Sequence, residues 1–176
     1  MKKQKSVSLD FIIDKLTDSI QNTISGDSFQ TENSRLTKSD LKNVTKKNGW
    51  NFNWKAELEN NSREVYKLTI VHNPTIIQGL VSFTIKDGHI YMELLESAPF
   101  NLGKSKLYEG VPGNLVAYVC KVSFQNGFEG FISFTAKTKL IEHYEKTLGA
   151  DHVGGNLMII PSHIAQKLVD KYFKSE

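Results

Sequence analysis

Residues 108–115 read Tyr-Glu-Gly-Val-Pro-Gly-Asn-Leu, and this stretch decides how the sequence around it is interpreted. A helix is predicted over residues 113–125, because apolar residues recur on one helical face and Asn-Gly follows. Glycine at 110 and 113 lets the main chain come close to another group. The free N–H groups of a helix start, together with the helix dipole, attract anions such as a diphosphate. The stretch is therefore a candidate phosphate-binding turn, although Gly-x-x-Gly before a helix is more often a plain turn.

Strand and helix patterns alternate on both sides of this turn. Downstream, the sequence predicts a strand, a helix, a strand and a last helix, at 128–135, 137–148, 153–160 and 162–173. Upstream, it predicts two strands, a Lys-Asp-Gly turn and a returning strand, at 64–71, 75–85, 86–88 and 89–95. This order predicts antiparallel strands followed by a partly parallel sheet that helices cover.

The first 50 residues are predicted to be largely helical. Apolar residues at helical spacing indicate an amphipathic helix over residues 8–23, with an inner face made of Leu9, Ile12, Ile13, Leu16 and Ile20. Residues 26–34 are polar and are predicted to be a loop, and a capping signal predicts a short helix over residues 37–47. The alternating residues 50–54 predict a half-buried strand.

Composition indicates one globular domain, residues 1–176. Hydrophobic residues make up 39% and charged residues 23% of the chain, which argues against global disorder. The net charge is only +3, so nucleic-acid binding has little support beyond Lys46-Lys47 and the basic first residues. A role beside nucleic acid remains the weakest alternative.

Cysteine content and hydropathy bear on location. The chain has one cysteine, Cys120, so an internal disulfide is impossible and a reducing, cytoplasmic location is expected. No apolar run approaches the roughly 20 residues of a membrane span. Met1–Lys5 resemble the start of a signal peptide, but acidic residues follow where an apolar region would be needed. The five histidines show no metal-ligand spacing, so no metal site is predicted.

Four motifs occur in a fixed order between residues 76 and 150. They are Leu-Leu-Glu-Ser-Ala-Pro-Phe-Asn at 94–101, the turn at 108–115, Gly-Phe-Glu-Gly at 127–130, and His-Tyr-Glu-Lys-Thr-Leu-Gly-Ala at 143–150. This series resembles the GNAT superfamily of acetyl-CoA-dependent N-acyltransferases, in particular its bacterial members. The turn departs from the usual Arg/Gln-x-x-Gly-x-Gly/Ala pattern at Tyr108 and Val111, and Pro112 removes one amide.

The resemblance implies a mixed α+β fold. In this fold a mostly antiparallel sheet splays around the coenzyme A cleft, and helices lie on both faces of the sheet. It also implies acetyl-CoA as the cosubstrate. The pantetheine and acetyl group would lie beside Leu94, Leu95 and Glu96, where a main-chain N–H polarises the thioester carbonyl. The diphosphate would lie over Gly110, Val111, Gly113, Asn114 and Leu115.

Two residues are implied as catalytic. Tyr144 matches the tyrosine that protonates the departing thiolate, although it also lies on an apolar helix face and could be a core residue. Glu96 is the leading base, with a solvated strand end as the alternative. Glu93 is its rival, and strict alternation places the two on opposite faces of the strand, a rule that a bulge would break. Cys120 is expected to be a packing residue.

The expected function is acetyl transfer from acetyl-CoA to an amine of a small molecule or a protein, by direct attack in a ternary complex. The alternative is a catalytically degenerate module that binds coenzyme A or a protein partner, which the altered turn favours. Residues 1–50 are expected to contribute to the acceptor side or to packing, and a homodimer is possible. The acceptor amine stays open.

Overall fold

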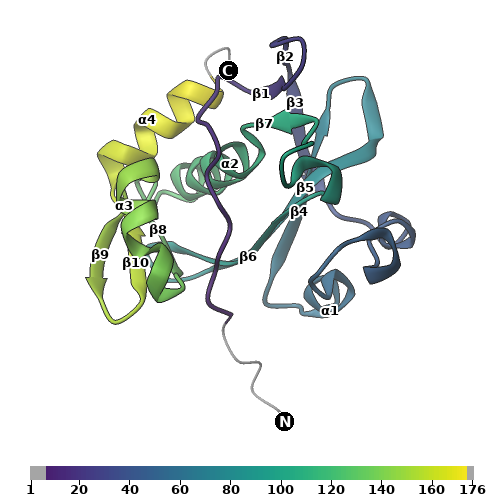
Figure 1. Ribbon diagram of the computed structural model, residues 1–176. Helices are drawn as coiled ribbons and strands as arrows, with labels where there is room; N and C mark the ends of the chain where they lie inside the picture. The colour runs from purple at the N-terminus through teal and green to yellow at the C-terminus, as the bar shows by residue number, and fades with distance from the viewer. Residues whose placement is uncertain (1–6, 174–176) are drawn as a thin grey trace.

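The computed structural model describes residues 7–173, and Figure 1 shows how they are arranged. Seven strands in this part of the chain form one sheet, in the order β3-β4-β5-β6-β8-β10-β9. Their bounds, in sheet order, are Thr31–Arg35, Glu64–Ile70, Asn73–Ile85, Ile90–Ser97, Ile132–Thr135, Leu157–Ile160 and Asp151–Gly154. Every neighbouring pair in the sheet so described is antiparallel except β6 and β8, which are parallel. The mostly antiparallel, partly parallel sheet that the sequence predicted is confirmed.

Helices cover both faces of this sheet. Their bounds are Trp54–Glu59 for α1, Val111–Gln125 for α2, Ile141–Leu148 for α3 and Ser162–Tyr172 for α4. Gly79 and Ser82 face opposite sides of β5, because side chains alternate along a strand. A Cβ on Gly79 would lie 2.8 Å from Val111 in α2, whereas Ser82 Oγ donates to Glu57 Oε2 in α1 over 2.8 Å. The α+β class with helices on both faces is therefore confirmed, and α4 lies against α2 (Figure 1).

Shorter elements connect these layers. Strands β2 (Ser28–Phe29), β1 (Ile20–Asn22) and β7 (Tyr108–Glu109) form a small antiparallel sheet. Because β7 directly precedes α2, this sheet ties the N-terminal region to the turn at the start of that helix. Single 3₁₀ turns occur at Asp40–Lys42, Lys46–Asn48, Pro99–Asn101 and Thr138–Leu140.

The predicted helix over residues 8–23 is wrong, and residues 7–19 run without helix to β1. Leu9, Phe11 and Ile13 are buried at every second position, whereas Ile12 is 53% exposed. Burial at every second residue is typical of an extended chain. The same residues also fit a helical spacing, and tertiary contacts stabilise the extended form. The helical description of residues 1–50 is corrected accordingly, since the described part holds only strands, loops and 3₁₀ turns. Met1–Lys5 lie outside the described residues.

Three further local predictions differ from the structure. The edge strand β3 starts at residue 31, within the loop predicted over 26–34, and its polar side chains give no apolar alternation. Residues 50–54 are a loop that starts α1, because Asn53 Oδ1 accepts from Ala56 N over 3.1 Å and so caps the helix. The strand predicted over 153–160 is a hairpin, β9 and β10, which turns at Gly154-Gly155.

Buried apolar side chains form one continuous cluster on both sides of β5 and β6. Cys120 is fully buried within it on α2, and burial raises the pKa of its thiol, as expected for a packing residue. None of the helices in residues 7–173 combines the length and the apolar character that a bilayer crossing requires.

Candidate active site

The parallel strands β6 and β8 separate soon after they meet. They pair only at Ile90 with Ile132 and at Tyr91 with Ser133, yet β6 continues to Ser97. The last side-chain link across the gap is a 2.6 Å hydrogen bond between the Tyr91 hydroxyl and Thr135 Oγ1. Beyond this point the two facing strand edges are free to bind something other than each other. This is the splayed pair that the resemblance implied.

The chain's own N-terminal region lies at this gap. We call residues 8–17 the N-terminal strap. Leu9 N donates to Thr135 O over 2.7 Å, and Lys137 N donates to Leu9 O over 3.0 Å. Ala136 N, between them, donates to Asn156 O on the β10 side. Because main-chain groups alternate between the two edges of a strand, Leu9 is bonded to the edge of β8 that faces β6.

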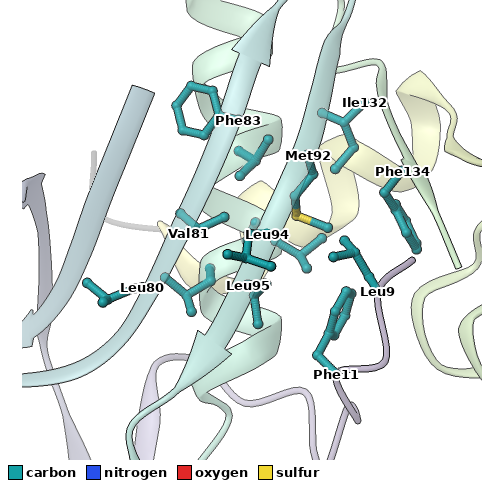
Figure 2. Close-up of a cluster of buried hydrophobic side chains, with 14 of the residues drawn as sticks. Leu9, Phe11, Leu80, Val81, Phe83, Met92, Leu94, Leu95, Ile132 and Phe134 are labelled. Atoms are coloured by element: carbon teal, nitrogen blue, oxygen red, sulfur yellow. The ribbon is translucent and has the colours of Figure 1, made fainter. Parts of the chain in front are cut away.

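Apolar side chains of the strap fill the space between the separated strands. Leu9 and Phe11 lie between Leu94 and Leu95 of β6 and Phe134 of β8 (Figure 2). The ring centroid of Phe11 is 5.8 Å from that of Phe134, and both strap side chains are buried. The strap passes in front of the sheet between its two halves and then reaches β1 (Figure 1). The gap is therefore occupied by peptide.

The turn before α2 also contacts the strap. Gly110 has φ +89°, in the left-handed region, and no side chain caps the first turn of α2. The Gly110 N–H donates to Asp14 Oδ1 over 3.2 Å, and Lys106 Nζ donates to Asp14 Oδ2 over 3.2 Å. The Asp14 carboxylate therefore stands as an anion where the sequence placed a diphosphate.

Both glycines of the turn are needed because the chain itself approaches them. A Cβ on Gly110 would overlap Thr17 and would lie 2.8 Å from Ser19 O. A Cβ on Gly113 would overlap the Tyr172 hydroxyl and would lie 2.8 Å from Leu16 Cδ2. The sequence rule that glycine permits close approach is right, and the group that approaches in this structure is the strap together with α4.

The other residues assigned to the cofactor are mostly buried. Val111 and Leu115 face the sheet, since a Cβ on Gly79 would lie within 2.9 Å of each. Asn114 is fully buried, and its Nδ2 donates to Thr31 Oγ1 over 3.1 Å. Leu94 and Leu95 are each 3% exposed. The side chains of these residues are therefore not available to a cofactor.

Tyr144 reaches the gap from α3, on the side opposite β6. Its hydroxyl donates to Phe11 O of the strap over 2.7 Å, and its ring lies 4.8 Å from the Phe11 ring between centroids. Burial, with a smaller contribution from Asp10, holds the pKa of this hydroxyl well above its usual value. Tyr144 is thus a buried core residue whose one polar group points at the strap.

Glu96 accepts three hydrogen bonds at the end of β6. Its donors are Asn51 N at 2.7 Å, Trp54 Nε1 at 2.8 Å and Phe52 N at 3.3 Å. The carboxylate therefore fixes the loop that leads into α1, a contact that sequence reasoning did not foresee. The side chain is buried rather than solvated, so the alternative of a solvated strand end is wrong.

Glu93 and Glu96 face the same side of β6. A bulge places Glu93 between Met92 and Leu94, opposite the step from Ser82 to Phe83. Glu93 accepts from Thr84 Oγ1 over 2.8 Å and lies 3.6 Å from Arg63, which also pairs with Glu57 of α1. The expectation of opposite faces is wrong, because a bulge breaks strict alternation.

A cleft of about 550 Å³ lies between the strap and the end of β6. Its walls include Phe11, Ile12, Phe52, Leu95, Glu96 and Pro112. Tyr144 does not line it, because the strap lies between. A second hollow of about 570 Å³, near β2 and the end of α4, contains none of the residues singled out by sequence. The first cleft is therefore the candidate acceptor site.

The strap is the functional feature that sequence reasoning missed. The available signal was the run Leu9-Asp10-Phe11-Ile12-Ile13, in which apolar residues also recur at every second position. Asn101, the last residue of the first motif, organises the loop before the turn. Its Nδ2 donates to Gln78 O and its Oδ1 accepts from Tyr108 N, each over 3.1 Å.

Comparison with solved structures identifies the fold. No protein-family model matches the chain, and no curated protein matches its sequence. Spermidine N-acetyltransferase from Vibrio cholerae, in complex with CoA and spermine, is similar with a TM-score of 0.53 at 14% identity, over 78% of this chain and 98% of that one. AtaTR bound with AcCoA gives 0.53 at 15% identity, over 79% and 98% of the two chains. A variant of the toxin AtaT, bound to the C-terminus of the antitoxin AtaR, gives 0.51 at 13%, over 79% and 96%. The chain therefore has the fold of these GNAT acetyltransferases, which confirms the fold that the sequence resemblance implied.

Proposed function

We propose that this protein is an N-acetyltransferase that transfers an acetyl group from acetyl-CoA to an amine. The observation that carries the proposal is the separation of β6 from β8 beside the Gly110 turn, with the Tyr144 hydroxyl across the gap. This arrangement supplies a strand edge for pantetheine, main-chain donors for phosphate and a proton donor. The similar solved structures that contain CoA or AcCoA support the same assignment.

The turn has donors that suit a phosphate. Asp14 already binds there as an oxyanion, through the Gly110 N–H and Lys106 Nζ, so the donor set accepts negative charge. The Val111 and Gly113 amides of the first turn of α2 would add to it, whereas Pro112 contributes none. The unpaired edge of β6 at Leu94, Leu95 and Glu96 would hold the pantetheine amides. Lys106 lies just before the turn, and its contact with the Asp14 carboxylate supports a role for its side chain in holding a phosphate.

The chemistry follows from these positions. The amine nitrogen attacks the thioester carbonyl carbon, the C–S bond breaks, and the acetyl group becomes an amide. Glu96 borders the acceptor cleft, and we assign it to accept the amine proton, directly or through water. Tyr144 would donate its proton to the departing thiolate, since a tyrosine hydroxyl is protonated at neutral pH. Positioning of the two reactants would supply most of the rate gain.

A second candidate is a non-catalytic module that binds CoA or a protein partner. The observation in its favour is that the strap already fills the gap and contacts Gly110 and Tyr144. In that case the strap would be a permanent part of the core. For the enzyme proposed above, the acceptor is an amine of a small molecule or a protein.

Acetyl-CoA binding and turnover test the proposal. We expect the melting temperature to rise with acetyl-CoA in a saturable way, because a ligand of the folded state at a hundredfold excess over Kd adds about 2.7 kcal/mol. An amine screen that follows free thiol release should then identify acceptors. Tyr144→Phe should lower kcat about 10²-fold, as loss of a general acid does, without weakening acetyl-CoA binding. No melting shift at millimolar acetyl-CoA, in the wild type and in variants with a weakened strap, would leave the non-catalytic module as the better description.

A further inference from the structure

The strap contacts each part of the site that acetyl-CoA would use. Leu9 and Phe11 fill the gap between β6 and β8, where pantetheine would lie (Figure 2). The Asp14 carboxylate takes the Gly110 N–H, where a diphosphate oxygen would bind. Phe11 O accepts a hydrogen bond from the Tyr144 hydroxyl, the group assigned to protonate the thiolate. One continuous segment of the chain thus occupies three places that a single acetyl-CoA molecule would use.

The main chain of the strap is bonded to elements other than β6. It is bonded to β8 through Leu9, to α3 through Phe11 O and through Ile13 N, which donates to His143 Nε2 over 3.0 Å, and to α4 through Thr17 N, which donates to the Tyr172 hydroxyl over 3.1 Å. Among the described residues, no hydrogen bond joins the strap main chain to that of β6. The edge of β6 that would pair with pantetheine therefore keeps its main-chain groups, while side chains of the strap take up the space beside it.

The polar anchors of the strap differ in exposure. Asp10 pairs with Lys137 over 2.7 Å, and both side chains are nearly half exposed, at 43% and 46%. Asp14 is 13% exposed and binds both a main-chain N–H and Lys106. Exposed ion pairs contribute little to binding, whereas charge-assisted hydrogen bonds of sheltered carboxylates contribute more. Of these two carboxylates, Asp14 is therefore the one that contributes more to docking of the strap.

We propose that the strap is an intramolecular competitor of acetyl-CoA, with its apolar residues in the place of pantetheine and Asp14 in the place of the diphosphate. The inference rests on the proposed function and adds the regulation of its cofactor site. The apparent Kd equals the intrinsic Kd divided by the fraction of molecules with an open strap. Anything that loosens the strap tightens acetyl-CoA binding by the same factor, until the strap is fully open. Covering Tyr144 also makes the docked form inactive.

A pair of single substitutions in the full chain tests the proposal. Asp14→Asn should bind acetyl-CoA about tenfold more tightly than the wild type in a calorimetric titration, as expected when one charge-assisted contact of the competitor is removed. Asp10→Asn is the matched control, with the same charge change in the same strap at an exposed pair, and it should bind as the wild type does. Weaker binding by Asp14→Asn would overturn the proposal, since Asp14 would then belong to the cofactor site.

A reversible lock gives an independent measurement. Leu9 and Ala136 are partners in a parallel bridge, so Leu9→Cys with Ala136→Cys should form a disulfide on oxidation. Cys120 is buried and should not interfere. We expect acetyl-CoA binding to disappear in the oxidised protein and to return on reduction. Hydrogen exchange at the Leu9 and Lys137 amides should quicken when acetyl-CoA binds.

The outcomes separate the two hypotheses. Equal binding in the oxidised and reduced forms, with Leu9 still protected, would show that the strap is a fixed wall of the site, and only the competitor inference would fail. No binding in any form, including the reduced lock and Asp14→Asn, would overturn the proposed function and the inference with it. Binding that requires reduction and increases in Asp14→Asn supports both.

Discussion

Gly110 illustrates how one residue links the strap to the turn. Its φ of +89° and the nearby Thr17 and Ser19 leave no room for a side chain. Gly103 has a similar φ of +73° but nothing within 4 Å of its Cβ position. We expect Gly110→Ala to lower the free energy of unfolding by about 3 kcal/mol, from backbone strain plus overlap, and Gly103→Ala by about 1 kcal/mol. Urea unfolding of both variants measures the difference, and equal losses would mean that the strap does not contact the turn.

The Glu96 carboxylate accepts three hydrogen bonds from the loop before α1 and from Trp54. Glu96→Gln replaces one acceptor oxygen by an NH₂ group that faces N–H donors, so we expect a loss of about 2–3 kcal/mol in the free energy of unfolding. Glu142→Gln, at an exposed pair with Lys146, is the control and should change little. A fully stable Glu96→Gln protein would contradict the anchoring role. Loss of turnover beyond what the stability loss explains would support its assignment as the base.

At the scale of an element, the extended strap and the predicted helix would bury different side chains. The predicted helix buries Ile12, whereas the extended strap buries Phe11 and leaves Ile12 53% exposed. Phe11→Ala should therefore cost about 3–4 kcal/mol of unfolding free energy, as large-to-small core substitutions do, and Ile12→Ala less than about 1 kcal/mol. Thermal or denaturant unfolding checks this pair. A larger loss for Ile12→Ala than for Phe11→Ala would instead support the helix predicted from the sequence and would contradict the extended strap.

Element by element, sequence periodicity succeeded where one side of an element is apolar. Helices α2 and α4 and the hairpin of β5 with β6 lie close to their predicted positions, because their buried faces are continuous and Asp87-Gly88 marks the turn. Strand β3 was missed because an edge strand needs no buried side chains. The hairpin of β9 with β10 was read as one strand, although Gly154-Gly155 was a visible turn signal.

At the scale of the whole molecule, His143 of α3 makes the docking of the strap on that helix sensitive to pH. Burial lowers its pKa below the usual 6.5, and Nε2 must be unprotonated to accept from Ile13 N. The contribution of this contact to stability is therefore complete above pH 6.5 and is lost as the pH falls through the lowered pKa.

The pH dependence can be measured against a variant that keeps an acceptor. His143→Gln retains an oxygen that can accept from Ile13 N and does not titrate. We expect the melting temperature of the wild type to fall more than that of His143→Gln between pH 7.5 and pH 5. Parallel curves for the two proteins would mean that His143 does not hold the strap in its neutral form.

The sequence by itself determined most of the order of strands and helices from residue 64 onward, apart from β7 and the division of 153–160 into a hairpin, together with the partly parallel sheet and the glycine turn at 110–113. Those features depend on local periodicity and turn chemistry, which neighbouring residues specify. Only the tertiary structure decided that residues 8–17 are extended, that a bulge turns Glu93 toward the same face as Glu96, and that Asp14 occupies the turn. Each of these depends on a partner far away in the chain. The strap pairs with β8 more than 120 residues later, and no local pattern encodes such a pairing.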